Sequence, residues 1–243
     1  LNTGQYLDLR GALDVAALER AVETAGIEAE SLSLRFAETA DGPVQMPDPA
    51  LRPALRILDL SAEADPEAAA LAVIRRDMAT VVVPEQGPLA RQTLYRLSPT
   101  RHFWAQQVHH FAIDGYGMVL LTARIAELYG LYAAGRDGGG RPLAGLAMLL
   151  ADDLRYRQSA ERAEDARWWK ERMAGQEEVV GLAPGRAVSA HDFHRFEAPL
   201  AGETREALLA LAKAAGVSWP DALTALVAAY CRRFAGTDEI TVG

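Results

Sequence analysis

The sequence predicts a layered α/β or α+β fold in which a mixed, mostly antiparallel sheet is flanked by helices. Segments with the two-residue alternation of strands are interleaved with segments of helical periodicity. Several strand candidates follow one another closely, as antiparallel neighbours do. Half of the 243 residues are hydrophobic, which is enough for one large or two small cores.

The first part of the chain is predicted to contain a helix and a hairpin. Asp14 is a suitable N-cap for a helix whose apolar face begins in residues 15–22, and Gly26 is expected to end it. Residues 32–36 alternate apolar and polar side chains and are expected to pair with a short strand at 44–46. The turn Asp41-Gly42-Pro43 between them favours this hairpin.

The central part alternates strands and helices. Strands are predicted over residues 55–60, 89–97 and 101–112. Between the first two lies a helix over 66–80, with proline at its first position, where a missing N–H costs nothing. A long apolar helix after Gly117 is expected to run to Gly135.

The last part of the chain is predicted to be mostly helical. Residues 136–142 are rich in glycine and form a flexible link, and one long charged helix follows over 146–174. A strand over 193–200 precedes a helix over 203–215. The helix predicted over 221–234 is so apolar that we expect it to be buried.

The segment HHFAIDG, residues 109–115, carries the chemistry that is easiest to interpret. Because successive strand side chains point to opposite faces, one of His109 and His110 is a candidate for chemistry and the other for packing. Adjacent strand histidines cannot converge on one ion, and no third ligand lies nearby, so we predict no metal site. Gly115 is expected to adopt a backbone conformation that a side chain would resist. The segment lies at a strand exit, where catalytic groups are commonly displayed.

This segment resembles the HHxxxDG signature of the condensation domains of nonribosomal peptide synthetases. His109, His110, Asp114 and Gly115 match it in full, and Tyr116 stands where the family usually has an aromatic residue. The resemblance extends along the chain through the segments 6–14, 87–97, 167–169 and 238–243.

The resemblance implies a chloramphenicol-acetyltransferase-like fold. Residues 1–175 are then the N-terminal lobe with the motif, 176–190 a linker between lobes, and 191–243 the beginning of a second similar lobe. A domain of this family is roughly twice as long, so we expect this one to be incomplete at both ends.

The resemblance also implies a reaction. An acceptor aminoacyl amine attacks a donor acyl or peptidyl thioester, and both substrates are carried on the 4′-phosphopantetheine arms of carrier proteins, with no cofactor bound to the domain itself. His110 takes the cleft-facing role as base, positioning group or electrostatic stabiliser, since a histidine pKa is close to working pH for all three. Gly115 contacts the thioester carbonyl through its backbone N–H. His109 packs the motif loop, and Asp114 braces it.

The sequence departs from the family pattern at two positions. Ser33 stands where the family commonly has an arginine that pairs with the motif aspartate. Arg35 lies two residues further along the predicted strand and hence on the same face, so it is the expected substitute partner of Asp114. Gly117 stands where a serine is frequent.

Composition limits the partners. A formal net charge of -8 argues against binding to nucleic acid. No apolar run reaches the roughly 20 residues that span a bilayer, and no signal sequence is recognisable, so we expect a cytoplasmic protein without membrane contact. By the resemblance, the partners are donor and acceptor peptidyl carrier proteins and an adjacent adenylation domain. Two alternatives stay open: an epimerisation domain of the same superfamily and a non-catalytic docking platform.

Overall fold

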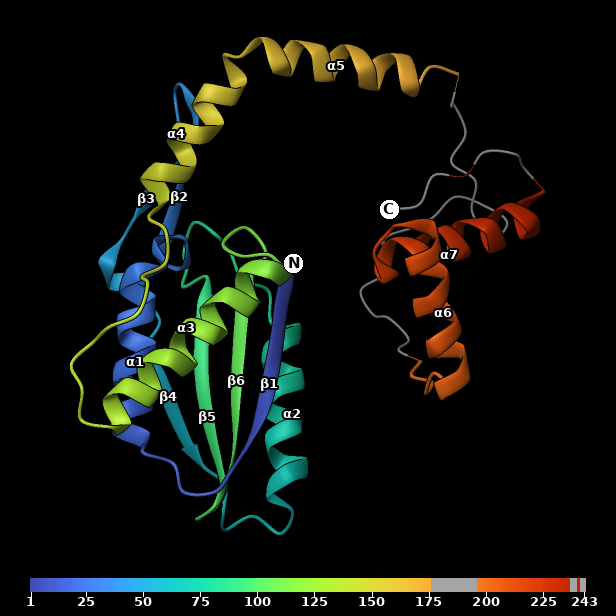
Figure 1. Ribbon diagram of the computed structural model, residues 1–243. Coiled ribbons are helices and arrows are strands. Elements are labelled where there is room, and N and C mark those ends of the chain that lie inside the picture. The colour runs from blue at the N-terminus through green and yellow to red at the C-terminus, as the bar shows by residue number, and fades with distance from the viewer. Residues whose placement is uncertain (176–195, 237–239, 241–243) are drawn as a thin grey trace. The chain divides into compact units, whose positions relative to one another are not determined.

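A four-stranded sheet forms the centre of the first of two units in the computed structural model, which describes residues 1–175, 196–236 and 240. Its strands are β1 (Asn2–Arg10), β4 (Leu55–Asp59), β5 (Ala90–Ser98) and β6 (Arg101–His109), in the order β1-β6-β5-β4 (Figure 1). Both neighbours of β6 are antiparallel to it, and β4 is parallel to β5. The predicted mixed, mostly antiparallel sheet is therefore confirmed.

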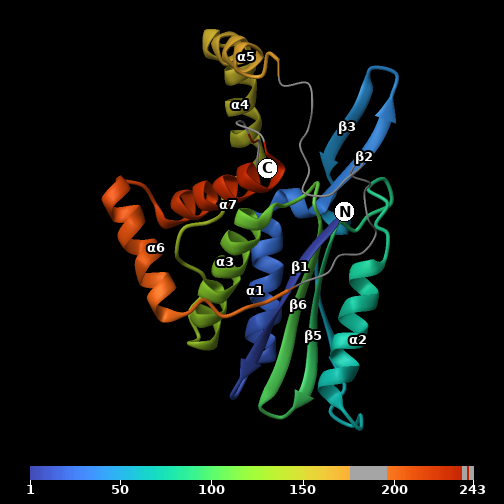
Figure 2. The ribbon, with the colours of Figure 1, turned by 90° about the vertical axis from the view of Figure 1, so that its right-hand side faces the viewer.

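Helices cover both faces of this sheet. The helices α1 (Val15–Glu28) and α3 (Gly115–Ala133) lie on one face, and α2 (Pro66–Ala79) lies on the other (Figure 2). Asp14 accepts a hydrogen bond from the backbone N–H of Ala17 at 3.0 Å and so begins α1 as predicted.

The two faces of the sheet carry separate cores because strand side chains alternate. Leu94, Trp104 and Val108 are buried against α1 and α3. Tyr95 and Phe103, each one residue away from a member of that set, are buried against α2. The alternation runs to His109, the last residue of β6, and His110 is the first residue of the turn that follows.

The predicted hairpin is present as β2 (Leu34–Thr39) and β3 (Gly42–Pro47), which pair antiparallel. The segment before it differs from the prediction. Residues Glu30–Ser33 form a 3-10 turn, in which the Ser33 hydroxyl donates to the carbonyl of Glu30 at 3.1 Å. Ser33 and Arg35 therefore do not share a strand face.

The long helix predicted over 146–174 is two helices, α4 (Leu146–Arg157) and α5 (Ala160–Arg172). The break lies at Ser159, whose hydroxyl donates to the carbonyl of Tyr156 at 2.7 Å and so competes with the helical ladder. The first compact unit ends at this break, as Leu1–Ser159, and the second is Ala160–Gly243. The predicted linker 176–190 lies outside the described residues, so that boundary stays a prediction.

The second unit also contains α6 (Gly202–Ala215) and α7 (Trp219–Ala235), which pack on each other. Both helices were predicted, but the expected burial of α7 is wrong for the described residues, where Tyr230 and Phe234 are more than half exposed. Residues 196–200 of the predicted strand 193–200 are irregular, and its other residues lie outside the described part.

Two element boundaries also differ from the prediction. Gly26 does not end α1, which continues to Glu28; its missing side chain lets Pro53 approach closely instead. The strand predicted over 101–112 ends at His109, because the Ala112 N–H donates to the His109 carbonyl at 2.9 Å and turns the chain. Within the part of the chain that is described, no helix is both long and apolar enough to cross a membrane.

Candidate functional site

The end of β6 fixes the backbone of both motif histidines. The His109 N–H donates to the carbonyl of Leu89 at 2.7 Å, and the His110 N–H donates to the carbonyl of Leu1 at 2.9 Å. The two bonds reach opposite neighbours of β6. The point where the strand becomes a loop is therefore held from both sides, close to the start of α3 (Figure 1).

His109 is buried, with 6% of its surface exposed. Its Nδ1 accepts a hydrogen bond from the Phe111 N–H at 3.2 Å, and the two rings meet edge to face with centroids 4.7 Å apart. Burial lowers the pKa of His109, and a ring nitrogen that accepts a hydrogen bond cannot carry a proton. His109 is thus a neutral side chain that holds the motif loop.

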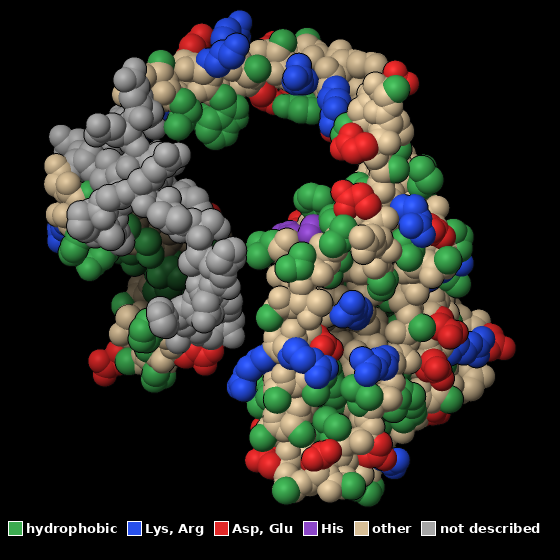
Figure 3. Space-filling view, turned by 180° about the vertical axis from the view of Figure 1, so that it is seen from behind, with side chains coloured by type: hydrophobic (Ala, Val, Ile, Leu, Met, Phe, Trp, Pro, Cys, Tyr) green, Lys and Arg blue, Asp and Glu red, His purple; other side chains and the backbone are tan. Residues whose placement is uncertain are grey.

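His110 is exposed, and among the described residues its side chain makes no hydrogen bond or ion pair. It lines a cavity of about 550 Å³ on the α3 side of the sheet end. Histidine and hydrophobic side chains reach the surface together at one end of this unit (Figure 3). An imidazole in this setting has both ring nitrogens available to a ligand.

Most of the cavity lining is apolar and comes from four parts of the first unit. These are the β2–β3 hairpin with the turn before it, the motif loop, α3, and the segment that begins α4. The apolar contributors include Leu34, Ile113, Leu120, Leu143, Leu146 and Leu149. Besides His110, the polar lining includes Glu30, Gln45 and Asp114. Such a site can hold an apolar group beside an imidazole.

Asp114 is the N-cap of α3. Its carboxylate accepts a hydrogen bond from the Gly117 N–H at 2.7 Å, and the side chain is exposed. The expected pair with Arg35 is wrong: Arg35 donates to Asp48 through Nη2 at 2.7 Å and Nε at 2.9 Å. Because Ser33 lies in a 3-10 turn, the strand register on which that expectation rested does not apply. Asp114 stabilises the loop through the helix start instead.

The two glycines after Asp114 differ in what they do. Gly115 is the first residue of α3, and its φ is not positive. A Cβ on Gly115 would meet nothing within 4 Å. The expected special conformation at Gly115 is therefore wrong. A Cβ on Gly117 would lie 2.7 Å from Cγ1 of Ile113, so Gly117 is the position at which the loop requires glycine. Tyr116 between them is 72% exposed.

The N-terminus of α3 faces the motif loop and carries backbone donors. The first N–H groups of a helix have no partner within it; here the Asp114 carboxylate accepts that of Gly117 and the Asp114 carbonyl accepts that of Met118. Across the described parts of the chain, no three side chains of His, Cys, Asp or Glu lie close enough together to hold a metal ion.

Two parts of the site were not predicted from the sequence: the segment 143–149 and Arg124. The signal for Arg124 is visible in the sequence, because a charged residue stands among Leu121, Ile125 and Leu128 on the apolar face of a helix. The segment 143–149 has no comparable signal.

The chain is similar to known proteins over its whole length. A family model described as "Condensation domain" matches residues 1–243. The dimodular nonribosomal peptide synthase of Bacillus subtilis (strain 168) is 35% identical over 242 residues, which are 100% of this chain and 10% of that protein.

Solved structures are similar over nearly the whole chain. A mutant starter condensation domain of rhizomide synthetase in complex with C8-CoA is 31% identical with a TM-score of 0.85, over 100% of this chain and 54% of that one. The first condensation domain of the calcium-dependent antibiotic synthetase, in complex with a substrate analogue, is 30% identical with a TM-score of 0.78, over 98% and 57%. The chain thus spans little more than half of these solved domains.

Proposed function

The chain belongs to the condensation domain family of nonribosomal peptide synthetases, and from this premise we propose that it joins a donor acyl or peptidyl thioester to an acceptor aminoacyl amine. Both substrates arrive on the 4′-phosphopantetheine arms of carrier proteins, and an adenylation domain is the expected neighbour. The observation that carries the proposal is the exposed His110 imidazole, which lines a cavity and has no partner among the described residues.

The proposed chemistry needs a proton acceptor at neutral pH. An α-amine has a pKa of about 7.7–8.0, so most of the acceptor is protonated and cannot attack. His110 accepts this proton or holds the amine in line with the thioester carbonyl. Once the ammonium has lost one proton to solvent by way of the imidazole, the neutral amine nitrogen bonds to the carbonyl carbon and the C–S bond breaks. The second proton of that nitrogen then passes through the imidazole to the leaving thiolate. Products are an amide and the free thiol of the donor arm.

Negative charge develops on the carbonyl oxygen during this attack. The free N–H groups in the first turn of α3, with Gly115 at its start, are the donors that we assign to this oxygen. The positive end of the α3 dipole acts in the same direction. His109 and Asp114 do not touch substrate in this scheme; they hold the loop that presents His110.

We propose a donor with an apolar acyl chain as the second, narrower candidate. The cavity lining beside His110 is mostly apolar, and a similar starter condensation domain is described in complex with C8-CoA. An acyl chain that fills this cavity removes apolar surface from water, which stabilises the bound donor by about 0.8 kcal/mol for each buried methylene.

The test combines the domain, in its natural polypeptide, with loaded donor and acceptor carrier proteins and follows the condensed product by intact mass. We expect His110→Ala to reduce product at least 100-fold while thermal unfolding is unchanged, because the side chain is exposed and unbonded. Glu38→Ala is the control, since Glu38 is an exposed residue of the first unit that does not line the cavity.

The outcomes separate the alternatives. Product that falls only in His110→Ala supports condensation through His110. A native enzyme that yields no product but inverts the Cα of a carrier-bound residue supports the epimerisation alternative. Carrier binding without either reaction supports the docking platform.

A further inference from the structure

One wall of the His110 cavity is a segment that the rest of the fold must hold in place. Residues 143–149, called the wall segment below, connect the loop after α3 to the first turn of α4. Leu143 and Leu146 are partly buried against the core, whereas Leu149 is 57% exposed. Apolar packing at two positions is a weak anchor for a segment that closes a binding site.

A buried ion pair between Arg124 and Glu28 contacts the wall segment. The Arg124 side chain on α3 is 5% exposed and donates to both carboxylate oxygens of Glu28, from Nε at 2.8 Å and from Nη2 at 2.7 Å. Its Nη1 donates to Glu127 at 2.6 Å and to the carbonyl of Gly139 at 2.8 Å. This guanidinium therefore joins α1, α3 and the loop that leads into the wall segment.

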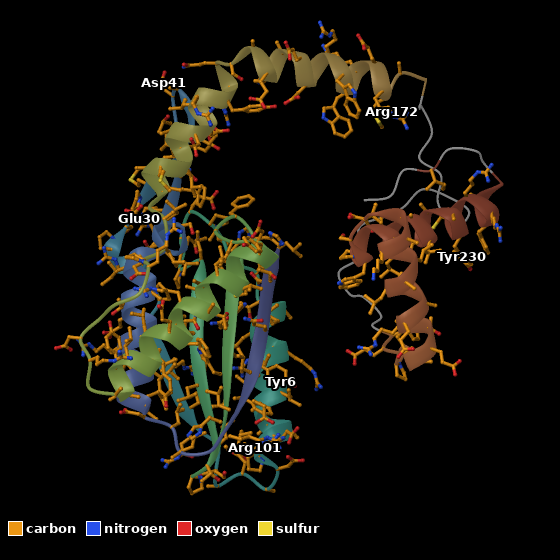
Figure 4. All side chains as sticks on the ribbon, in the orientation of Figure 1. Tyr6, Glu30, Asp41, Arg101, Arg172 and Tyr230 are labelled. Carbon is orange, nitrogen blue, oxygen red and sulfur yellow. The ribbon has the colours of Figure 1, made fainter. Side chains whose placement is uncertain are left out.

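The same carboxylate also reaches the wall segment itself. Oε2 of Glu28 accepts the Leu143 N–H at 3.1 Å, and Oε2 of Glu30 accepts the Leu146 N–H at 2.8 Å. The hydrogen bond from Arg124 lowers the pKa of Glu28, so the carboxylate is charged at neutral pH. Glu30 lies where α4 begins (Figure 4). Two carboxylates, one at the end of α1 and one in the 3-10 turn that follows, thus hold the backbone of the wall segment at two points.

We propose that Arg124 and Glu28 are positioning residues that fix the wall segment and thereby set how long an acyl chain the cavity accepts. This inference rests on the proposed function, because the ligand of the wall is the donor acyl group. Neither residue touches the reacting atoms. They act through the backbone position of Leu143, whose side chain lines the cavity beside His110.

Glu127 provides a matched control for Glu28. Both glutamates pair with Arg124, but the Glu127 side chain is 45% exposed, against 15% for Glu28. Among the described residues, Glu127 makes no hydrogen bond to the wall segment, whereas Glu28 makes the one to Leu143. Removing the charge from each glutamate in turn separates two effects. One is the loss of an ion pair with Arg124, and the other is the loss of the hydrogen bond that holds the wall segment.

The experiment compares Glu28→Gln with Glu127→Gln. Amide hydrogen exchange measures protection at Leu143 and Leu146, and titration measures the Kd of S-hexanoyl and S-dodecanoyl pantetheine. In Glu28→Gln we expect protection of the Leu143 amide to fall at least tenfold and the ratio of the two Kd values to change at least fivefold. In Glu127→Gln we expect both quantities to stay within twofold of the native protein.

The two Kd values are measured without turnover, so they test the inference separately from the reaction. A native protein that binds the pantetheine probes but forms no amide overturns the proposed function and leaves the inference standing. Unchanged protection of Leu143 in Glu28→Gln overturns the inference. A loosened wall with an unchanged ratio of Kd values overturns it too.

A second variant keeps the inference testable if Glu28→Gln does not fold. Arg124→Lys keeps the positive charge but cannot make the forked contact with Glu28 or reach Gly139 at the same time. We expect it to loosen the Leu143 amide and shift the ratio of Kd values in the same direction as Glu28→Gln. If Arg124→Lys keeps the native protection of Leu143 and the native ratio of Kd values, the two-point contact between Arg124 and Glu28 does not have the proposed role.

Discussion

At the scale of single residues, the site depends on where β6 ends. His109 is the last residue of the strand and is buried, whereas His110 begins the turn after it and is exposed. The sequence predicted that the two differ, since strand side chains alternate. The tautomer of His109 could not be predicted, because its acceptor role depends on the Phe111 N–H in the turn that follows.

The two glycines of the motif loop should respond differently to alanine. Gly117→Ala places a Cβ against Ile113, and overpacking of this kind costs about 1–3 kcal/mol of unfolding free energy. Gly115→Ala meets no neighbour and needs no unusual φ, so we expect its stability to stay within about 0.5 kcal/mol. Urea unfolding of the two variants measures the difference. Equal losses would contradict it.

The activity of Gly115→Ala then tests whether Gly115 contacts the bound thioester. A stable variant that has lost product formation places Gly115 in direct contact with the bound thioester. Full activity would contradict the proposal that the N–H groups at the start of α3 donate to the carbonyl oxygen.

The buried histidines should make the fold sensitive to acid. Burial lowers the pKa of His102 and of His109 below the ordinary 6.5, so the unfolded chain binds more protons than the folded one as pH falls. The unfolding free energy is then fully present above pH 6.5 and decreases as pH falls from 6.5 towards the lowered values. Urea titrations at several pH values measure this slope. His102→Gln should flatten it, and an unchanged slope would show that His102 does not contribute.

At the scale of elements, capping and periodicity predicted most of the first unit. Asp14 and Asp65 begin α1 and α2 as N-caps, and the hairpin turn lies at Gly42, where φ is 109°. The errors have local physical causes. Gly26 was taken as a stop signal, although its role is close packing against Pro53. The break between α4 and α5 falls at Gln158 and Ser159, where the Ser159 N–H and hydroxyl both donate to the Tyr156 carbonyl, and periodicity does not reveal it.

The N-cap of α1 offers a direct test of this reasoning. Asp14→Ala removes the acceptor of the Ala17 N–H, and we expect a loss of about 1 kcal/mol in the free energy of unfolding. Asp14→Asn keeps a good capping side chain and should lose less than half of that. Thermal unfolding of both variants measures the two losses. The reverse order would show that the charge, not the cap, is what matters.

At the scale of the whole molecule, the motif located the histidine but not the cavity around it. Its lining comes from four segments spread from residue 29 to residue 149, and only the motif loop carries a recognisable pattern. The partner expected for Asp114 failed for a similar reason, since it assumed a strand register that the turn at Ser33 interrupts. Long-range placement depends on packing that local rules do not contain.

The pairing of β1 with β6 has a consequence for how the protein folds. Asn2 lies opposite His109, and the Leu1 carbonyl accepts the His110 N–H, so these contacts join distant parts of the chain. By contrast, β5 and β6 are separated only by residues 99 and 100. Loop-closure entropy favours the local hairpin first, and strand pairs of high contact order form later. We expect β1 to be added late, which leaves the backbone at His110 among the last parts to become ordered as the chain emerges from the ribosome.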